Sequence, residues 1–466
     1  MSYRFKLWSE KTRNVFTKAL GAKVLRKTSD SRQFKLLIIT QFFPPDYAAT
    51  GQLISELSHQ LSEQNIEVNV FTGQPGYAYQ QEQAPKIEVD RRVKIRRTTF
   101  RQFYSQRIRS KTLNGAIFTL RSAWHLLRNA RQYNAVILTT APPFLAVVGY
   151  LANLVTKLEY ICLVYDLYPD VVIELGVISP NNAIAKLWHK INGHIWQRSQ
   201  EIVVLSETMK HRIVAQHPTI ANQISVIHNW ADPNWIEPIS KAENWFAQQH
   251  QLRDKFTVLY SGNLGHCHDM DTILETAKLL REQEIQFVFI GAGAKYQKCQ
   301  AMVAELKLGN CLFLPYQDRA NLPYSLTACD LALVSIAPGL EGVVAPSKVY
   351  GIMAAGKAIA AVCESHSYLR QLISDAHCGV AVDNHHSQQL AEFILILAAN
   401  PDLAKDMGDA GRNYLQQHFT PQKIAQQYCS VLRVNNSSLD CSKHELFNRH
   451  EHILYGMVDN QPTTHS

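Results

Sequence analysis

The fold is decided by the stretch Thr257-Val-Leu-Tyr-Ser-Gly-Asn-Leu-Gly-His-Cys-His-Asp-Met-Asp271. An apolar run rich in β-formers leads into a loop with two glycines, and a helical pattern follows at residues 271–281. Gly262 and Gly265 permit unusual backbone angles. The free N–H groups at the start of the following helix would suit a diphosphate. The stretch therefore predicts an anion-binding strand–loop–helix unit.

A DxD pattern closes the same stretch at Asp269 and Asp271. Two such carboxylates can hold a metal ion through their oxygen atoms. Aspartate is also a preferred N-cap residue, and a helix begins here. We favour the N-cap interpretation and expect no metal and no other cofactor.

The same alternation extends outward in both directions along the chain. Short apolar runs alternate with helical patterns from residue 34 onward, which indicates parallel sheets covered by helices. The expected strands are 36–40, 68–71, 93–97, 135–139, 160–165, 202–205, 225–227, 257–260, 287–290, 312–314, 331–335 and 358–362. We predict an α/β protein with two Rossmann-like, doubly wound domains that face each other across a cleft and bind ligands at the carboxyl ends of their strands.

Breaks in this alternation set the expected domain limits. Residues 229–255 interrupt the rhythm with two prolines, three tryptophans and many polar residues, as a linker would. The predicted order is a basic extension (1–33), an acceptor-side domain (34–230), a linker (231–255), a nucleotide-sugar domain (256–415), a C-terminal helix that returns toward the first domain (416–433) and a polar tail (434–466).

Composition narrows the class of protein. The chain has 466 residues, of which 46% are hydrophobic and 18% charged, as in globular proteins with buried cores. The most apolar stretch, Phe144–Val155, is too short to span a bilayer and is predicted to be a buried helix. No secretory signal pattern is present, and nine cysteines stand at irregular spacings. These features favour a cytoplasmic protein with reduced thiols.

Positive charge is concentrated in two segments. Residues 1–33 carry a net +7, and residues 91–131 carry twelve Lys and Arg with no acidic residue, whereas the whole chain is only +8. This pattern indicates an anionic partner such as a membrane surface or a phosphate-bearing acceptor, although a solvated basic face remains an alternative. Nucleic acid is not expected, because no nucleic-acid motif accompanies the charge. Residues 1–33 also space their apolar side chains like an interfacial helix, unless they form a disordered extension.

A second motif, Gly339-Leu-Glu-Gly-Val-Val-Ala-Pro-Ser-Lys348, precedes another predicted helix at residues 348–355. Pro346 suits the first turn of that helix, with Ser347 and Lys348 beside it. A cation at this end opposes the helix dipole, and the placement makes sense if a phosphate lies between them. Glu341 could accept hydrogen bonds from sugar hydroxyls. The alternative is an ordinary helix with an exposed lysine.

Two further loops are candidates for the site. The first strand runs into Pro44-Pro-Asp46 and then Gly51, a loop in which Thr50 is expected to cap the next helix and leave N–H groups for an anion; a plain connection is the alternative. The run Ile290-Gly-Ala-Gly293 is an incomplete dinucleotide fingerprint, because Tyr296 stands at the last position.

Taken in order, these motifs resemble glycosyltransferase family 4, whose members have the GT-B fold. Leu314-Pro-Tyr316 and Asp166-Leu-Tyr-Pro-Asp170 complete the set, and the latter is similar to the capsule, colanic-acid and O-antigen branch. The resemblance covers residues 34–433. It implies a retaining transferase that moves a sugar from a nucleoside-diphosphate donor, usually uridine-based, to a growing saccharide on a lipid carrier.

The resemblance also assigns residues. Lys348 would bind the diphosphate, and Glu341 would contact the donor sugar. Asp166, at the end of a predicted strand, is our own candidate for positioning the sugar or acceptor or for acting as a base, and a plain turn or cap residue is the alternative. These three residues form the predicted catalytic set. The full donor-binding set is Gly51, Asn263, Gly265, Gly291, Pro315, Tyr316, Glu341, Gly342, Pro346, Ser347 and Lys348.

Two positions depart from the family pattern. Gly351 replaces the glutamate that normally binds ribose, and the usual phosphate-binding arginine is absent, with His266 and His268 nearby. Two other functions therefore stay open: a sugar-nucleotide epimerase of the same fold, or a catalytically inert nucleotide-binding scaffold. If the protein is an active transferase, the resemblance suggests that the leaving phosphate takes the proton of the acceptor hydroxyl.

Overall fold

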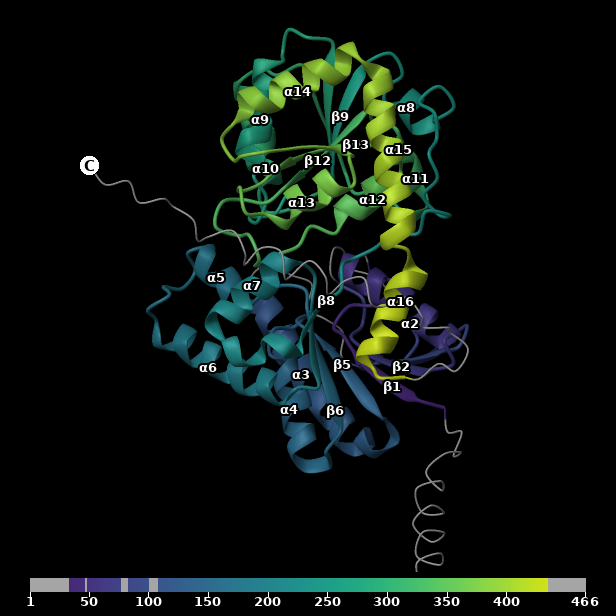
Figure 1. The fold of residues 1–466 in the computed structure, drawn as a ribbon, viewed down its shortest axis with the longest axis vertical. Coiled ribbons are helices and arrows are strands. Elements are labelled where there is room, and N and C mark those ends of the chain that lie inside the picture. The colour runs from purple at the N-terminus through teal and green to yellow at the C-terminus, as the bar shows by residue number, and fades with distance from the viewer. Residues whose placement is uncertain (1–32, 47, 77–82, 100–107, 435–466) are drawn as a thin grey trace, which may run out of the picture.

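The computed structural model describes residues 33–46, 48–76, 83–99 and 108–434, and in this part the strands form an eight-stranded and a six-stranded sheet (Figure 1). The eight-stranded sheet has the order β3-β4-β2-β1-β5-β6-β7-β8. Its strands are β1 Lys35–Ile39, β2 Glu67–Thr72, β3 Ile87–Asp90, β4 Val93–Arg97, β5 Ala135–Thr139, β6 Glu159–Val164, β7 Glu201–Val204 and β8 Ile224–Val226. All described pairings are parallel except β3 with β4.

Helices cover both faces of this N-terminal sheet. Its central strands are buried along nearly their whole length, which explains their continuous apolar runs. The helices of the domain are α2 Ala49–Glu63, α3 Ile108–Asn129, α4 Leu145–Thr156, α5 Asp170–Glu174, α6 Ala183–Arg198 and α7 Glu207–Gln216. On α2 the buried residues include Ile54, Leu57 and Leu61, the stripe that faces the sheet.

The six-stranded sheet is parallel throughout and has the order β11-β10-β9-β12-β13-β14. Its strands are β9 Phe256–Ser261, β10 Ile285–Ile290, β11 Cys311–Leu314, β12 Leu331–Ser335, β13 Ala358–Val362 and β14 Gly379–Val382. The helices that follow the N-terminal domain are α8 Trp245–Gln249, α9 Met270–Leu279, α10 Tyr296–Glu305, α11 Leu322–Thr327, α12 Lys348–Ala354, α13 Tyr368–Asp375, α14 Ser387–Ala399, α15 Pro401–His418 and α16 Pro421–Val431.

The chain passes between the domains along two neighbouring segments. The first follows β8, and the second lies between α15 and α16, where the C-terminal helix turns back and packs on α2 (Figure 1). The two segments touch, because the Ala231 N–H donates to the carbonyl of Phe419 at 3.4 Å. Arg412 on α15 adds hydrogen bonds to the carbonyls of Pro233 and Ile236, both at 2.8 Å.

The observed elements confirm most of the predicted ones. The strands predicted at 93–97, 135–139, 331–335 and 358–362 match to the residue. The predicted linker contains the short helix α8, whose first turn is capped by the Asn244 side chain. The sequence analysis missed β3 and β14, which are short and lie at or next to sheet edges. The predicted helix at 144–155 exists as α4, but its burial was wrong: Leu151, Leu154 and Val155 are exposed.

Two observations bear on the other sequence predictions. Within the described residues, no helix is long and apolar enough to cross a bilayer. The predicted interfacial helix at 1–33 and the polar tail lie outside the described residues, apart from single positions at their inner ends. Eight of the nine cysteines lie in the described part, and all eight are free thiols.

Candidate functional site

The site lies where strand order reverses in each sheet. In the C-terminal sheet β9 lies between β10 and β12, so the loops that leave β9 and β12 diverge and open a space at their carboxyl ends. The loop after β9 is the glycine loop of the sequence analysis, and the loop after β12 carries Glu341. The N-terminal sheet has the same reversal at β1, between β2 and β5.

The glycines of the loops after β9 and β10 allow two backbones to come close. Gly291 has a φ of +141°, and a Cβ on it would lie 2.0 Å from the carbonyl oxygen of Gly262. Gly293 has a φ of +148°, and its Cβ would lie 2.4 Å from the side-chain oxygen of Asn263. The Leu264 N–H donates to the carbonyl of Ala292 at 2.8 Å. The two glycines of the GxG pattern therefore let the loop after β10 pack closely against the glycine loop after β9. This packing does not require the last residue of a dinucleotide fingerprint.

Lys348 begins α12 and points its ammonium at the glycine loop. Its Nζ lies 3.5 Å from the centre of the Tyr260 ring and is within 3.5 Å of where a Cβ on Gly262 would be. The Nζ atom is buried and has no hydrogen-bond partner among the described residues. Burial lowers the pKa of Lys348 to about 7. A buried ammonium beside an aromatic face, with no hydrogen-bond partner, has the chemistry to bind an anion.

The start of α12 differs in one detail from the prediction. The helix begins at Lys348 itself, with Ser347 at the N-cap and Pro346 before it, so placing Pro346 in the first turn was wrong. Ser347 adopts helical dihedrals and makes no side-chain cap bond. The Ser347 hydroxyl therefore does not cap the backbone N–H groups at the start of α12.

His268 of the glycine loop does not replace the missing arginine. Burial and, to a smaller extent, the nearby Lys348 lower the pKa of His268 to about 3, so its ring is neutral. The ring Nδ1 lies 2.9 Å from the carbonyl oxygen of Ser335. A second cation, Lys295, donates from Nζ to the carbonyl of His268 at 2.5 Å. Sequence reasoning missed Lys295; its position two residues after Gly293 was the available signal.

Asp269 is the N-cap of α9, as the sequence analysis favoured. One carboxylate oxygen accepts the Thr272 N–H at 3.0 Å, and the other accepts the Thr272 hydroxyl at 2.7 Å and the Asn384 amide at 2.8 Å. Asp271 lies in the first turn and forms an ion pair with Lys298 at 3.3 Å. Across the described residues, no group of three or more His, Cys, Asp and Glu side chains could hold a metal ion.

Glu341 is buried, at 3% exposure, in the loop after β12. Neither of its carboxylate oxygens has a well-formed hydrogen bond to a described residue. Burial raises the pKa of Glu341 to about 7, although the nearby Ser367 hydroxyl opposes the shift. Like Lys348, it is a buried polar group that lacks a partner, and such groups call for an explanation such as a ligand.

Asp166 comes to the same place from the other domain. Its backbone forms an isolated antiparallel bridge with Val344, which also bridges to Glu341. Next to it, the Leu167 N–H donates to the carbonyl of Val343 at 2.9 Å. Burial raises the pKa of Asp166 to about 6. The carboxylates predicted from two distant motifs therefore belong to backbone segments that touch across the domain interface.

Arg212 on α7 fastens this interface, and sequence reasoning did not find it. Its guanidinium binds Asp170 at 3.1 Å and also Glu174, both in its own domain. Across the interface it donates to the carbonyls of Gly339 and Glu341, at 3.3 and 3.2 Å. The arginine thus holds the loop that carries Glu341 against the N-terminal domain.

Gly342 completes this contact because only glycine fits there. Its φ is +70°, and a Cβ would lie 2.5 Å from the carbonyl oxygen of Thr208 in α7. The chain places this glycine directly after Glu341, so the close approach of the two domains and the position of the carboxylate are coupled.

The remaining predicted residues lie around this centre. A Cβ on Gly51 would lie 2.9 Å from the backbone of Phe42, so this glycine seats α2 against the loop after β1. The proposed cap at Thr50 was wrong, because α2 begins at Ala49 and Ala48 is its N-cap. Tyr316 donates to the carbonyl of Ala292 at 3.4 Å, next to Pro315, which is exposed.

Comparison with known proteins identifies the family. Residues 50–235 match the family described as Glycosyltransferase Family 4, and residues 241–414 match Glycosyl transferases group 1. The chain belongs to glycosyltransferase family 4. The matched segments include every predicted site residue in both domains.

Two relatives of this chain are themselves described as glycosyltransferases. The chain is 24% identical to the putative colanic acid biosynthesis glycosyl transferase WcaI of Escherichia coli, covering 86% of this chain and 100% of the relative. It is also 24% identical to the probable glycosyltransferase WbjE of Pseudomonas aeruginosa, covering 66% and 76%. The relatives thus support the resemblance to the polysaccharide-biosynthesis branch.

Solved structures confirm the GT-B fold. Sucrose-phosphate synthase from Thermosynechococcus elongatus has a TM-score of 0.69 at 17% identity, over 86% of this chain and 98% of that one. Anabaena HepE, solved in complex with UDP and glucose, has a TM-score of 0.64 at 15% identity, over 86% and 100%. WaaG, described as a glycosyltransferase involved in lipopolysaccharide biosynthesis, has a TM-score of 0.63 at 13% identity, over 86% and 100%.

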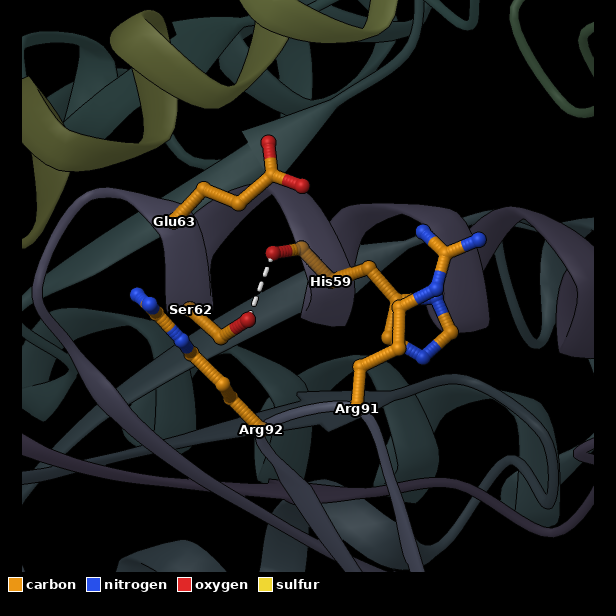
Figure 2. A pocket seen from close by; sticks show the side chains of 5 residues that line it. All are labelled: His59, Ser62, Glu63, Arg91 and Arg92. Atoms are coloured by element: carbon orange, nitrogen blue, oxygen red, sulfur yellow. Dashed lines mark hydrogen bonds between the residues drawn. The ribbon is translucent and has the colours of Figure 1, made fainter.

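A separate hollow on the glycosyltransferase surface is not part of this site. A hollow of about 340 Å³ is lined by His59, Ser62, Glu63, Arg91 and Arg92. In it the Ser62 hydroxyl donates to the carbonyl of His59 (Figure 2). Arg91 and Arg92 precede β4, and Glu63 ends α2. These positions lie at the amino ends of the parallel strands, whereas Lys348, Glu341 and Asp166 gather at the carboxyl ends.

Proposed function

We propose that this glycosyltransferase moves a sugar from a nucleoside-diphosphate donor, most simply a UDP-sugar, to a saccharide carried on a lipid, with retention and without a metal ion. The observation that carries the proposal is the buried, unpartnered ammonium of Lys348 beside the glycine loop, with the unpartnered carboxylate of Glu341 in the next loop. A diphosphate joined to a sugar supplies a partner for each.

The donor diphosphate would bind beside Lys348 and the glycine loop. As the sugar bond breaks, negative charge builds on the leaving phosphate, and preorganised N–H dipoles and cations stabilise it most effectively in a buried site. Lys348 would carry this charge directly, and Lys295 would add to it from behind the loop. Uridine as the base is supported by the solved HepE complex with UDP and glucose.

The sugar and acceptor would bind near Glu341 and Asp166. Glu341 would hold the hydroxyls of the donor sugar, because its oxygens need partners once buried. Asp166 would position the acceptor from the opposite domain, where Val344 forms a backbone bridge with both Asp166 and Glu341. In a retaining reaction with this layout, the leaving phosphate takes the proton of the acceptor hydroxyl.

Independence from metal is supported by how the DxD carboxylates are used. Both oxygens of Asp269 are engaged by Thr272 and Asn384, and Asp271 is paired with Lys298. Lys348 and Lys295 would do for the diphosphate what a divalent cation would otherwise do.

The acceptor and location rest on charge and on the relatives. The acid-free basic segment at 91–131 belongs to the N-terminal domain, where the acceptor would enter, and WcaI is described as acting in colanic acid biosynthesis. A lipid-linked acceptor at the cytoplasmic face of a membrane would account for both. The protein would then be a peripheral enzyme of that face.

A donor screen tests the proposal. Purified protein is heated with a panel of nucleotide sugars, since a ligand that binds only the native state raises the melting temperature. Those that stabilise it are then tested for turnover with a labelled donor. Stabilisation and sugar transfer support the proposal. Stabilisation without turnover would indicate an inert nucleotide-binding scaffold, and conversion of the donor to its epimer would indicate an epimerase.

A further inference from the structure

Three helices of the N-terminal domain each expose one line of large apolar side chains. On α3, Leu113, Leu120, Trp124 and Leu127 are spaced seven, four and three residues apart, which places them on a single face of the helix. Trp124 is 61% exposed and Leu120 is 72% exposed. We call the whole set the apolar face: Leu113, Leu120, Trp124 and Leu127 on α3; Phe144, Leu151, Leu154 and Val155 on or next to α4; and Ile184, Leu187 and Ile191 on α6.

The three helices are neighbours, so their lines combine into one surface. Helix α3 packs on α4, and α4 packs on α6, away from α2 and α16, which cover another part of the sheet (Figure 1). Phe144 stacks on Trp188 of α6 with ring centres 4.9 Å apart, which joins α4 to α6. Isolated exposed leucines are ordinary on a protein surface, but a contiguous patch of this kind marks an interaction site.

The three helices that carry the apolar face bear no acidic side chain. Helices α3, α4 and α6 contain no Asp or Glu, and none occurs anywhere from residue 91 to residue 158. The exposed cations along the edge of the face are Arg128, Arg131, Lys157, Lys186, Lys190 and Arg198. Arg128 also lies 4.0 Å over the ring of Trp124, so a cation and an aromatic ring are presented together.

We propose that the apolar face docks onto the surface of an anionic lipid bilayer. Leucine, valine and tryptophan side chains can enter the boundary between headgroups and acyl chains, while the surrounding lysines and arginines meet anionic headgroups. A second copy of this chain is a poor occupant, because pairing two such faces would bring their cations together without any anion from these helices.

The face also leads to the active site. Trp188 stacks on Tyr168 with ring centres 6.0 Å apart, after stacking on Phe144 at its other side. Tyr168 follows Asp166 by two residues. This aromatic column therefore connects the end of the apolar face at Phe144 with the loop that carries the proposed acceptor-positioning carboxylate. A saccharide held at the bilayer by its lipid would be presented on the side of Asp166.

This inference deepens the proposed function, since it names the surface that would receive a lipid-linked acceptor. It differs from attachment through residues 1–33 alone, because the docking surface belongs to the folded N-terminal domain. It also explains why α4 keeps an apolar sequence while only part of the helix is buried.

The test is vesicle co-sedimentation of the full chain, with phosphatidylcholine vesicles that either contain or lack phosphatidylglycerol. The test variant carries Leu120→Gln, Val155→Gln and Leu187→Gln, one change on each helix. The matched control carries Leu279→Gln, Ile396→Gln and Leu403→Gln, which are also exposed apolar positions but lie in the C-terminal domain. A third protein lacks residues 1–33. UDP binding by each protein is measured by calorimetry without vesicles.

We expect the unchanged and control proteins to bind phosphatidylglycerol vesicles, and the test variant to lose at least about tenfold in partitioning, since each buried apolar side chain contributes favourably to insertion. The protein that lacks residues 1–33 should keep binding that depends on the apolar face. Equal vesicle binding by the test variant and the control overturns the inference. Two other outcomes would also overturn it: the unchanged protein associates with itself and does not bind vesicles, or it binds an acidic protein and does not bind vesicles. UDP binding tests the proposed function independently: its absence in every protein would overturn that function while leaving the docking result intact.

Discussion

Lys348 holds its ammonium nitrogen 3.5 Å from the centre of the Tyr260 ring, with no hydrogen-bond partner among the described residues. Burial has lowered the pKa of this lysine to about 7. A bound phosphate would favour the charged form and raise that pKa, so binding above pH 7 requires the lysine to take up a proton.

UDP binding should therefore weaken as the pH rises. Above pH 7 the affinity is expected to fall by up to about tenfold per pH unit, until the pKa of the bound state is reached. Calorimetry in buffers of different ionisation enthalpy measures both the affinity and the proton uptake. In Lys348→Arg the cation stays charged, and the slope should flatten. Since Glu341 also has a pKa of about 7, a slope that disappears only in Glu341→Gln would assign the effect to that carboxylate.

Asp166 should set the acid limit of turnover. Burial raises its pKa to about 6, so the carboxylate form is present above that value and is lost as the pH falls through it. If this form positions the acceptor, kcat should drop by about tenfold per pH unit below pH 6. Asp166→Asn should be slow at all pH values and should lose this limb. An unchanged limb in the variant would show that another group titrates. Asp90→Asn, on an exposed carboxylate, is the control.

Gly342→Ala should impair catalysis by forcing the domains apart. The added Cβ would meet the carbonyl of Thr208 at 2.5 Å. Gly176 offers a matched control, because its φ is +71°, against +70° for Gly342, but nothing lies within 4 Å of its Cβ position. Both variants should lose about 1–2 kcal/mol of unfolding free energy from the left-handed backbone. Only Gly342→Ala should also lose turnover, by about tenfold or more. Equal turnover in both would mean that this contact is not needed.

Arg212→Ala should lower turnover by about tenfold or more, since charge-assisted hydrogen bonds are worth about 1.5–3 kcal/mol each. It would release the carbonyls of Gly339 and Glu341 across the interface, and within the N-terminal domain it would remove the arginine partner of Asp170 and Glu174. Small-angle scattering should show a larger radius of gyration for the variant with UDP bound. Arg281→Ala removes an exposed arginine paired only with its neighbour Glu282 among the described residues, and it should change neither quantity.

Chelation should leave sugar transfer unchanged. Asp269 is committed to capping α9, and the cations of Lys348 and Lys295 already face the glycine loop. Transfer is measured before and after EDTA treatment, with magnesium and manganese added back separately. Loss of activity that either metal restores would show that the DxD carboxylates had been misinterpreted.

The parts of the fold that the sequence predicted best are those with strong local signals. The central strands are apolar along their whole length because helices cover both faces, and the cap at Asp269 follows from residue type and position alone. The edge strand β3 was missed because it has four residues and only intermediate or exposed positions, so it lacks the apolar run that marks a buried strand.

Long-range contacts were beyond reach of the same reasoning. Arg212 lies 129 residues from Glu341, whose carbonyl it binds, and no local pattern connects them. The sequence shows that residue 291 is a glycine but not that it lies against Gly262, because Gly262 belongs to the preceding strand–loop unit. The burial of α4 was overestimated since an apolar composition does not reveal which side of a helix has neighbours.

The direct bond between Ala231 and Phe419 has a mechanical consequence. Because the two crossings of the chain are fastened to each other and to Arg412, the domains share one pivot rather than two separated ones. We expect their relative motion to be a rotation about this pivot, in which displacement grows with distance from the pivot. Small changes in a few backbone angles at this pivot would move the loop that carries Glu341 away from the loop that carries Asp166. Substitutions at this pivot could thus alter the rate of donor entry and product release without touching any bound molecule.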